Sequence, residues 1–139
     1  MLDLDKARRF FLSAPFMADL GIEPVAVSEG RMRTELAVAP RHLQHTGQVH
    51  AGVMATLADH TMGAAAQTTA PEGYWIITAE LKTSLLRPGR GDRLVCVASV
   101  IKPGRQVCFT EAEVFAENGG QRTLVCKASA TMAVVATKG

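Results

Sequence analysis

Residues 44–59 read Q-H-T-G-Q-V-H-A-G-V-M-A-T-L-A-D, and this stretch decides the fold. A Gly-containing turn leads into a helix, expected over residues 49–69, that consists almost wholly of Ala, Val, Leu, Met and Gly. One carboxylate, Asp59, lies inside this apolar run. Burying a carboxylate costs free energy unless something pairs with it or uses it. We therefore expect the function to lie at Asp59.

Alternating apolar residues between turn signals predict strands on both sides of this helix. The strands are expected at residues 24–28, 32–38, 75–86, 93–101, 106–116 and 122–135. Residues 3–16 suggest a short amphipathic helix, capped by Asp3 and limited by Pro15. Since no repeat or linker is visible, residues 1–139 are interpreted as one domain. The pattern predicts an antiparallel meander with a long helix inserted near its start.

The long helix lacks the polar stripe that a helix on one open face of a sheet should show. Small residues, such as Ala58 and Gly63, would let other elements approach it closely. We therefore expect an α+β fold in which a curved sheet wraps the helix and a second subunit covers its free side.

Composition and charge exclude several function classes. Hydrophobic residues make up 47% of the chain and charged residues 20%, which favours a globular protein. The net charge is only +2, with scattered basic residues and one Trp, which argues against nucleic-acid binding. Residues 53–66 form the most apolar run, too short to span a bilayer, and no secretory signal opens the chain. Three Cys without CxxC spacing favour reduced, buried thiols and a cytoplasmic protein.

Asp59 is the first candidate for chemistry. In an apolar pocket a carboxylate becomes more basic and can serve as general base or nucleophile; the alternative is a carboxylate on an exposed helix edge. The helix start at His50-Ala51-Gly52 offers backbone N–H groups without intrahelical partners, which can hold an oxyanion. Gln44 can add a side-chain amide donor, or it can be a solvated loop residue.

Other kinds of site find little support. The four His lack metal-ligand spacing, and neither G-x-S-x-G nor a nucleotide-binding Gly motif is present. His50 is expected to order the turn by hydrogen bonding. Arg87, Arg90, Lys102 and Arg105 are expected to cluster in two turns of neighbouring strands, where they are either solvated or partners for ligand phosphates.

In these residues the chain resembles the hotdog-fold acyl-CoA thioesterases of the phenylacetate-pathway type, over roughly residues 20–135. The family pattern is an amide residue, a Gly, H-G-G and then a helical Asp; the turns at residues 86–92 and 102–105 also look familial. The chain departs from it in three ways, with Gln44 for the commoner Asn, Ala51 for the first Gly of H-G-G, and His60 after the acid. The matching residues are Gln44, Gly47, His50, Ala51, Gly52 and Asp59.

The resemblance implies a six-stranded antiparallel sheet around the helix, and a dimer with one continuous sheet, usually paired into a tetramer. It implies a composite active site in which Asp59 of one subunit attacks the thioester or activates water. The Ala51 N–H and the Gln44 amide of the other subunit would hold the thioester oxygen, and Thr78 would position water. Substrate contacts are expected from His50, Gly52, Arg87, Lys102 and Arg105. No metal or organic cofactor is implied, since coenzyme A is part of the substrate.

Two other functions stay open. One is a hotdog protein that binds acyl-CoA without cleaving it, although Asp59 would then have no purpose. The other is a hydroxyacyl-thioester dehydratase that pairs His50 with Asp59. The acyl group is also open between aryl-acetyl, benzoyl-type and short-to-medium aliphatic chains, on CoA or on a carrier protein.

Overall fold

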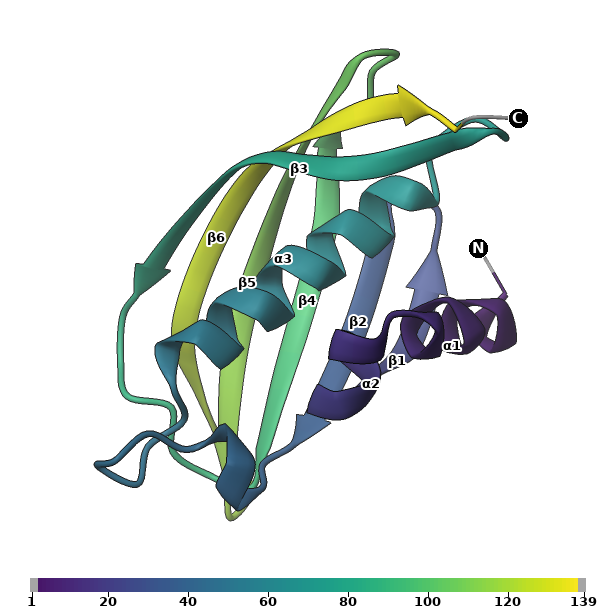
Figure 1. The fold of residues 1–139 in the computed structure, drawn as a ribbon. Coiled ribbons are helices and arrows are strands. Elements are labelled where there is room, and N and C mark those ends of the chain that lie inside the picture. The colour runs from purple at the N-terminus through teal and green to yellow at the C-terminus, as the bar shows by residue number, and fades with distance from the viewer. Residues whose placement is uncertain (1–2, 138–139) are drawn as a thin grey trace.

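The long helix α3 (Ala51–Gln67) crosses the concave side of a curved, six-stranded antiparallel sheet (Figure 1). The computed structural model describes residues 3–137. The predicted strands are all present, within a few residues of their expected limits. They are β1 (Ile22–Ser28), β2 (Arg31–Ala37), β3 (Tyr74–Leu85), β4 (Arg93–Lys102), β5 (Val107–Asn118) and β6 (Gln121–Ala136).

The strand order corrects the predicted meander. The strands lie in the order β1-β2-β4-β5-β6-β3, so β3 neighbours neither β2 nor β4. The reason is α3, which carries the chain across the sheet and delivers β3 to the far edge. There β3 pairs with β6 alone, and the chain then returns to place β4 beside β2.

The N-terminal segment also differs from the prediction, because it holds two helices rather than one. Helix α1 (Leu4–Ser13) begins at the predicted cap, where the Asp5 N–H donates to Asp3 Oδ1 at 2.8 Å. Pro15 limits this helix, as expected, and also begins a second one, α2 (Pro15–Leu20). The residue before a proline is disfavoured in helical conformation, and Ala14 is extended, with ψ 111°. Proline itself suits a first helical turn.

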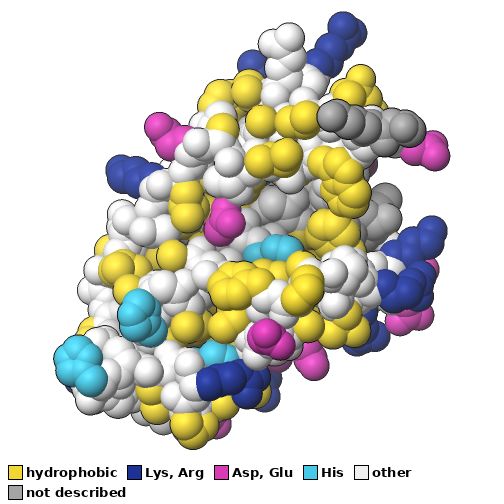
Figure 2. All heavy atoms as spheres, in the orientation of Figure 1, with side chains coloured by type: hydrophobic (Ala, Val, Ile, Leu, Met, Phe, Trp, Pro, Cys, Tyr) yellow, Lys and Arg dark blue, Asp and Glu magenta, His cyan; other side chains and the backbone are white. Residues whose placement is uncertain are grey.

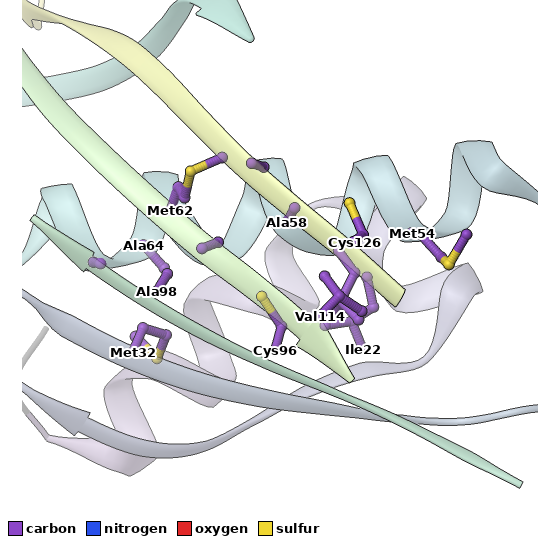
Figure 3. Packing of buried hydrophobic residues seen from close by; sticks show 14 of the residues in the cluster. Ile22, Met32, Met54, Ala58, Met62, Ala64, Cys96, Ala98, Val114 and Cys126 are labelled. Carbon is purple, nitrogen blue, oxygen red and sulfur yellow. The ribbon is translucent and has the colours of Figure 1, made fainter. Parts of the chain in front are cut away.

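The core lies between α3 and the sheet. Leu57, Ala58 and Met62 are fully buried, and Figure 3 shows side chains of α3 facing those of the strands. Truncating a buried Leu or Met to Ala typically costs about 2–5 kcal/mol, so this contact fixes where α3 lies. The three Cys are free and buried, as expected. Burial raises the pKa of the Cys96 thiol to about 12, so it stays protonated and unreactive at neutral pH.

Two features of the surface bear on function. Strand β3 is an edge strand twelve residues long, and several of its large apolar side chains are exposed, Trp75 to 50% and Ile77 to 54%. Long apolar edges are uncommon on isolated protomers because they invite pairing with another chain. Between residues 3 and 137, no helix is both long and apolar enough to cross a membrane.

Candidate active site

Asp59 lies at the middle of α3 and faces β3, where it has a partner. The Thr78 hydroxyl donates a hydrogen bond of 2.7 Å to Asp59 Oδ1. The register of β3 against β6 shifts directly after Thr78, between Thr78 and Glu80. Such a bulge bends a strand and re-aims its side chains, and bulges are common beside active sites. In a single protomer Asp59 is half-buried, so both predicted residues share one site that remains open on one side.

A cleft of about 200 Å³ opens beside this pair, between α1, α3 and β3. Figure 2 shows this face of the molecule, with hydrophobic side chains on both sides of a hollow. Helix α3 contributes residues 59, 60, 63, 64 and 67 to the lining, and positions three and four apart share one helix face. The lining residues include Phe10, Asp59, Gly63, Gln67, Ile76 and Thr78.

His60 also lines this cleft, within a cluster of aromatic rings. Its ring meets that of Phe11 edge-on, with centroids 4.5 Å apart, and stacks on Phe10 at 6.1 Å. Burial lowers the pKa of His60 below 6.5, against the opposing charge of Asp59. The imidazole is therefore neutral at pH 7. Within residues 3–137 its buried Nε2 has no hydrogen-bond partner, so His60 contributes a ring to the wall rather than a charge.

The start of α3 leaves one backbone donor without a partner. His50 orders the turn by a hydrogen bond, and it does so as the helix cap, accepting a 2.8 Å hydrogen bond from the Gly52 N–H at Nδ1. The His50 carbonyl accepts from the next two N–H groups, those of Val53 and Met54. Among the described residues the Ala51 N–H has no partner, and it sits at the positive end of the helix dipole. It is the donor predicted for the oxyanion.

Gln44 lies beside this donor, in a second cleft of about 280 Å³ that both residues line. A tight turn holds Gln44, because its N–H donates to the Gln48 carbonyl and its carbonyl accepts from Gly47. The turn after β3 forms the opposite wall of this second cleft. It is attached to the start of α3 because the Val49 N–H donates to the Gly89 carbonyl at 2.9 Å. A Cβ on Gly89 would lie 3.0 Å from the Val49 Cβ, so glycine allows this close approach.

One protomer does not bring the two clefts together. Ala51 and Asp59 are eight residues apart on α3, which at 1.5 Å per residue is about 12 Å along the axis. No single carbonyl group reaches both. His50 is one residue further away and uses Nδ1 as the cap, so it does not pair with Asp59 within a protomer.

The four basic residues lie at two turns, as expected, but these turns are at opposite ends of β4 in a single protomer. The turn with Arg87 and Arg90 precedes β4, whereas Lys102 and Arg105 follow its other end. Ten residues of strand separate the turns by about 30 Å. Arg87 lines the cleft with Gln44 and donates to the Leu124 carbonyl at 2.8 Å. Lys102 and Arg105 line a separate, exposed hollow.

Sequence reasoning missed two residues that shape the site. Phe10 reaches the Asp59 cleft from α1, and no local pattern indicates which strand or helix α1 covers. His42 is completely buried below the Gln44 turn, where its Nδ1 accepts from the Ala39 N–H and its Nε2 lies 2.8 Å from the Leu20 carbonyl. Pro40, two residues before His42, begins a short 3₁₀ turn and was the available signal.

Comparisons with known proteins place this geometry in a family. The family model of the thioesterase superfamily matches residues 46–123, more than half of the chain. A curated protein of Halobacterium salinarum, named "Putative esterase", is 35% identical over 100 residues. The match covers 68% of this chain and 66% of that protein, so about a third of the relative has no counterpart here.

Solved structures have the same fold over most of this chain. A thioesterase family protein from Silicibacter pomeroyi superposes with a TM-score of 0.91 at 30% identity, covering 95% of this chain and 97% of that one. A Bacillus halodurans protein solved with CoA gives 0.69 at 29% identity, covering 73% of this chain and 70% of the other. The hotdog fold predicted for the sequence is therefore confirmed.

Proposed function

The chain belongs to the thioesterase superfamily, and from this premise we propose that it hydrolyses an acyl-CoA thioester to a free acid and CoA. One observation carries the proposal. A single helix presents a carboxylate held by a hydroxyl, at Asp59 and Thr78, and a backbone N–H without a partner, at Ala51. A base or nucleophile and an oxyanion donor are the two groups that acyl transfer needs.

In this mechanism Asp59 acts on the thioester carbonyl carbon. It either attacks that carbon itself, giving an anhydride that water then opens, or takes a proton from the attacking water. In both cases the C–S bond breaks and CoA leaves as the thiolate. The hydrogen bond from Thr78 fixes the direction of one carboxylate oxygen and leaves the other for the reaction.

The Ala51 N–H and the Gln44 amide hold the oxyanion from the neighbouring subunit. Removing one such donor in a protease costs about 2.7–4 kcal/mol, so two donors matter to the rate. Because Ala51 and Asp59 lie about 12 Å apart in one protomer, the active site is completed by a second copy. Two antiparallel α3 helices put each Asp59 beside the other chain's Ala51 when the two-fold axis passes near Ala55, midway between them.

The exposed edge of β3 supports this dimer. Pairing β3 with its symmetry mate satisfies the free backbone groups of the edge and continues the sheet across the two-fold axis. It also covers apolar side chains that a single protomer leaves in water. These are Tyr74, Trp75, Ile77, Leu81 and Leu85. Pairing of two dimers into a tetramer is a further part of the proposal, and light scattering distinguishes the two assemblies.

The same symmetry suggests how CoA is held. Arg87 lies near the helix start that holds the oxyanion. The two-fold axis reverses the strands, so the partner's turn with Lys102 and Arg105 points toward the Arg87 end of this protomer. The CoA phosphates are then bound by basic side chains from two chains. The Bacillus halodurans relative solved with CoA supports this choice of ligand.

The test is release of free thiol from a panel of acyl-CoAs by the wild type and by Asp59→Asn. Asparagine keeps the shape but provides neither base nor nucleophile, so turnover should fall by orders of magnitude. The matched control is Asp19→Asn, on the exposed side of α2, which should leave turnover unchanged. If acyl-CoAs raise the melting temperature and no thiol appears, the protein is a binder. Loss of water from a 3-hydroxyacyl-CoA without thiol release would instead identify a dehydratase.

A further inference from the structure

Two threonine hydroxyls are buried between α3 and the interior of the sheet. Thr61 of α3 and Thr34 of β2 are both completely buried, and their Oγ1 atoms lie 2.7 Å apart. The Thr61 hydroxyl also donates a hydrogen bond of 2.6 Å to the Leu57 carbonyl, one turn earlier in the helix. Burying a hydroxyl costs free energy unless it is hydrogen-bonded, and valine would fill the same space without a polar atom. The proposed chemistry does not use these hydroxyls, so they need another explanation.

The protons of the two hydroxyls point in one direction. A carbonyl oxygen only accepts, so the single proton of the Thr61 hydroxyl goes to Leu57. Thr61 then has no proton left for Thr34, and the Thr34 hydroxyl donates to Thr61 Oγ1. The result is a directed chain of hydrogen bonds from β2 through Thr61 to the backbone of α3. Bonds in such a chain polarise and strengthen one another in a low-dielectric interior.

This chain of hydroxyls connects α3 to a strand in the interior of the sheet. Among the described residues, the side chains of Asp59 and Gln67 also bond from α3 to a strand, but both bond to β3. Strand β3 lies at the edge and has one neighbour within the protomer, whereas β2 lies between β1 and β4. Thr34 therefore ties α3 to a strand that is itself held on both sides.

The apolar contacts of α3 hold it on the sheet but define its register less closely. The buried apolar residues of this helix are mainly Ala and Met. Small side chains leave few ridges that could interlock with the sheet, and Met adapts to many shapes. A single buried polar contact can, by contrast, fix the register of a helix. The hydroxyl chain thus provides a directional contact that the apolar packing lacks.

Asp59 lies on the same turn as this contact, but on the opposite side of the helix. Residues two apart in an α-helix are separated by about 200° around the axis, so Asp59 faces β3 when Thr61 faces β2. Figure 1 shows these two strands on opposite sides of α3. The turn is thus held from two sides, by the Thr34 hydroxyl and by the Thr78 hydroxyl. A rotation or slide of α3 that breaks the contact with Thr34 also moves Asp59.

We propose that Thr34 and Thr61 are positioning residues, which act on the reaction by fixing the register of α3 and thereby the place of Asp59. The inference rests on the proposed thioesterase function and its dimer. Asp59 and the oxyanion donor Ala51 lie on the same helix, and the two helices of the dimer run antiparallel. A slide of each helix along its axis therefore changes the spacing between Asp59 and the partner's Ala51 by twice the slide, about 1 Å for a slide of about 0.5 Å.

The experiment replaces both hydroxyls at once, by combining Thr34→Val with Thr61→Val. Replacing both partners of a hydrogen bond by apolar groups of the same shape can be nearly neutral for stability, so the double variant should keep its urea midpoint. A misplacement of about 1 Å costs about 10²-fold in rate, so kcat for the best acyl-CoA should fall at least about tenfold. KM should stay within about twofold, because kcat and kcat/KM fall together when only the transition state loses stabilisation.

Thr34→Val alone is the milder variant. It also breaks the connection to β2, and it leaves the Thr61 hydroxyl bonded to Leu57, so no donor is left without an acceptor. It should show the same loss of kcat, and it replaces the double variant in every measurement if the double variant does not fold. An unchanged kcat in a folded variant would overturn the inference.

Two control variants separate positioning from a purely structural role. Thr61→Ser keeps the hydroxyl and should retain most of the wild-type kcat. Thr110→Val removes another buried hydroxyl, which donates to the Ala130 carbonyl of β6 at 3.2 Å rather than to α3. It should lower the urea midpoint and leave kcat unchanged. A loss of kcat in Thr110→Val as large as in the double variant would contradict the inference, because any buried hydroxyl would then matter equally.

Crystal structures separate this inference from the proposed function, because they need no turnover. Superposed on the sheet of the wild type, the double variant should show α3 displaced at Asp59 by about 0.5 Å or more. A displaced helix in a protein that releases no thiol supports the positioning role and refutes only the thioesterase. A helix that stays in place refutes the positioning role, whatever the activity.

Discussion

Two inactive variants should restore activity when they share a dimer. Asp59→Asn removes the reacting carboxylate, and Gln44→Ala removes one oxyanion donor. In the composite site that we propose, Asp59 and Gln44 of the same site belong to different chains. A mixed dimer therefore holds one site with both residues intact and one site with both residues replaced.

The fraction of activity restored follows from the structure and from the number of intact sites in a mixed dimer. The separation of about 12 Å between Ala51 and Asp59 in one chain leaves only sites built across the two-fold axis. Random assortment of equal amounts makes half of the dimers mixed, each with one working site, so activity per chain should return to about a quarter of the wild type. Loss of an oxyanion donor lowers kcat about 10²–10³-fold, so each variant alone gives a background of about one per cent or less.

The assay co-expresses the two variants, or mixes and refolds them, and follows thiol release from the best acyl-CoA. Two controls accompany it, each variant mixed with itself under the same conditions. Activity at the sum of the two backgrounds would refute the composite site, because a site built within one chain cannot be repaired by mixing. The mixture is first shown to contain mixed dimers, so that a negative result cannot come from a failure of the two variants to mix.

Three further outcomes are expected. Thr78→Val removes the hydrogen bond to Asp59 and should lower kcat about tenfold, which corresponds to about 1.4 kcal/mol. Thr78→Ser keeps the hydroxyl and should retain most activity. Equal rates in the wild type and both variants would show that the hydroxyl does not orient the carboxylate. Because burial lowers the pKa of His60 below 6.5, the unfolded state binds its proton more readily, and stability is lost as the pH falls through 6.5 toward the folded-state value. His60→Phe should reduce the drop in the urea midpoint between pH 7.5 and 5.5, and an unchanged drop would contradict this. Ile77→Lys places a charge on the exposed edge of β3 and should give inactive monomers in light scattering; an active dimer would show that the edge is not the interface.

The sequence predicted what depends on local pattern. Every strand and the long helix follow from apolar periodicity and turn residues, and Asp3 caps the N-terminal helix as expected. The family resemblance selected both Asp59 and Thr78 for the site, but it gave Thr78 the positioning of water; the 2.7 Å hydrogen bond from Thr78 to Asp59 is a finding of the structure. These features depend on neighbours along the chain or on a motif with fixed spacing.

What the sequence could not predict depends on contacts between distant segments. The position of β3 beside β6 is set by the path of α3 across the sheet, which no strand pattern encodes. For the same reason the sequence gives no distance between the turn with Arg87 and the turn with Lys102, which a full strand separates. The sequence did not predict that Phe10 lines the site, because the position of α1 depends on tertiary packing.

The place of β3 at the far edge also orders events during folding. Its hydrogen-bonding partner within the protomer is β6, the last strand in sequence, so a growing chain exposes β3 from the time it leaves the ribosome until β6 has been made. Long-range pairings of this kind form late, and unpaired apolar strands are prone to aggregate while they wait. In the proposed dimer, the free edge of β3 becomes able to pair with a second subunit only when its other edge has paired with β6. Subunits that pair through β3 would therefore assemble only after the whole domain has folded. In a chain interrupted before β6, β3 is not held in a sheet and cannot pair with a second subunit.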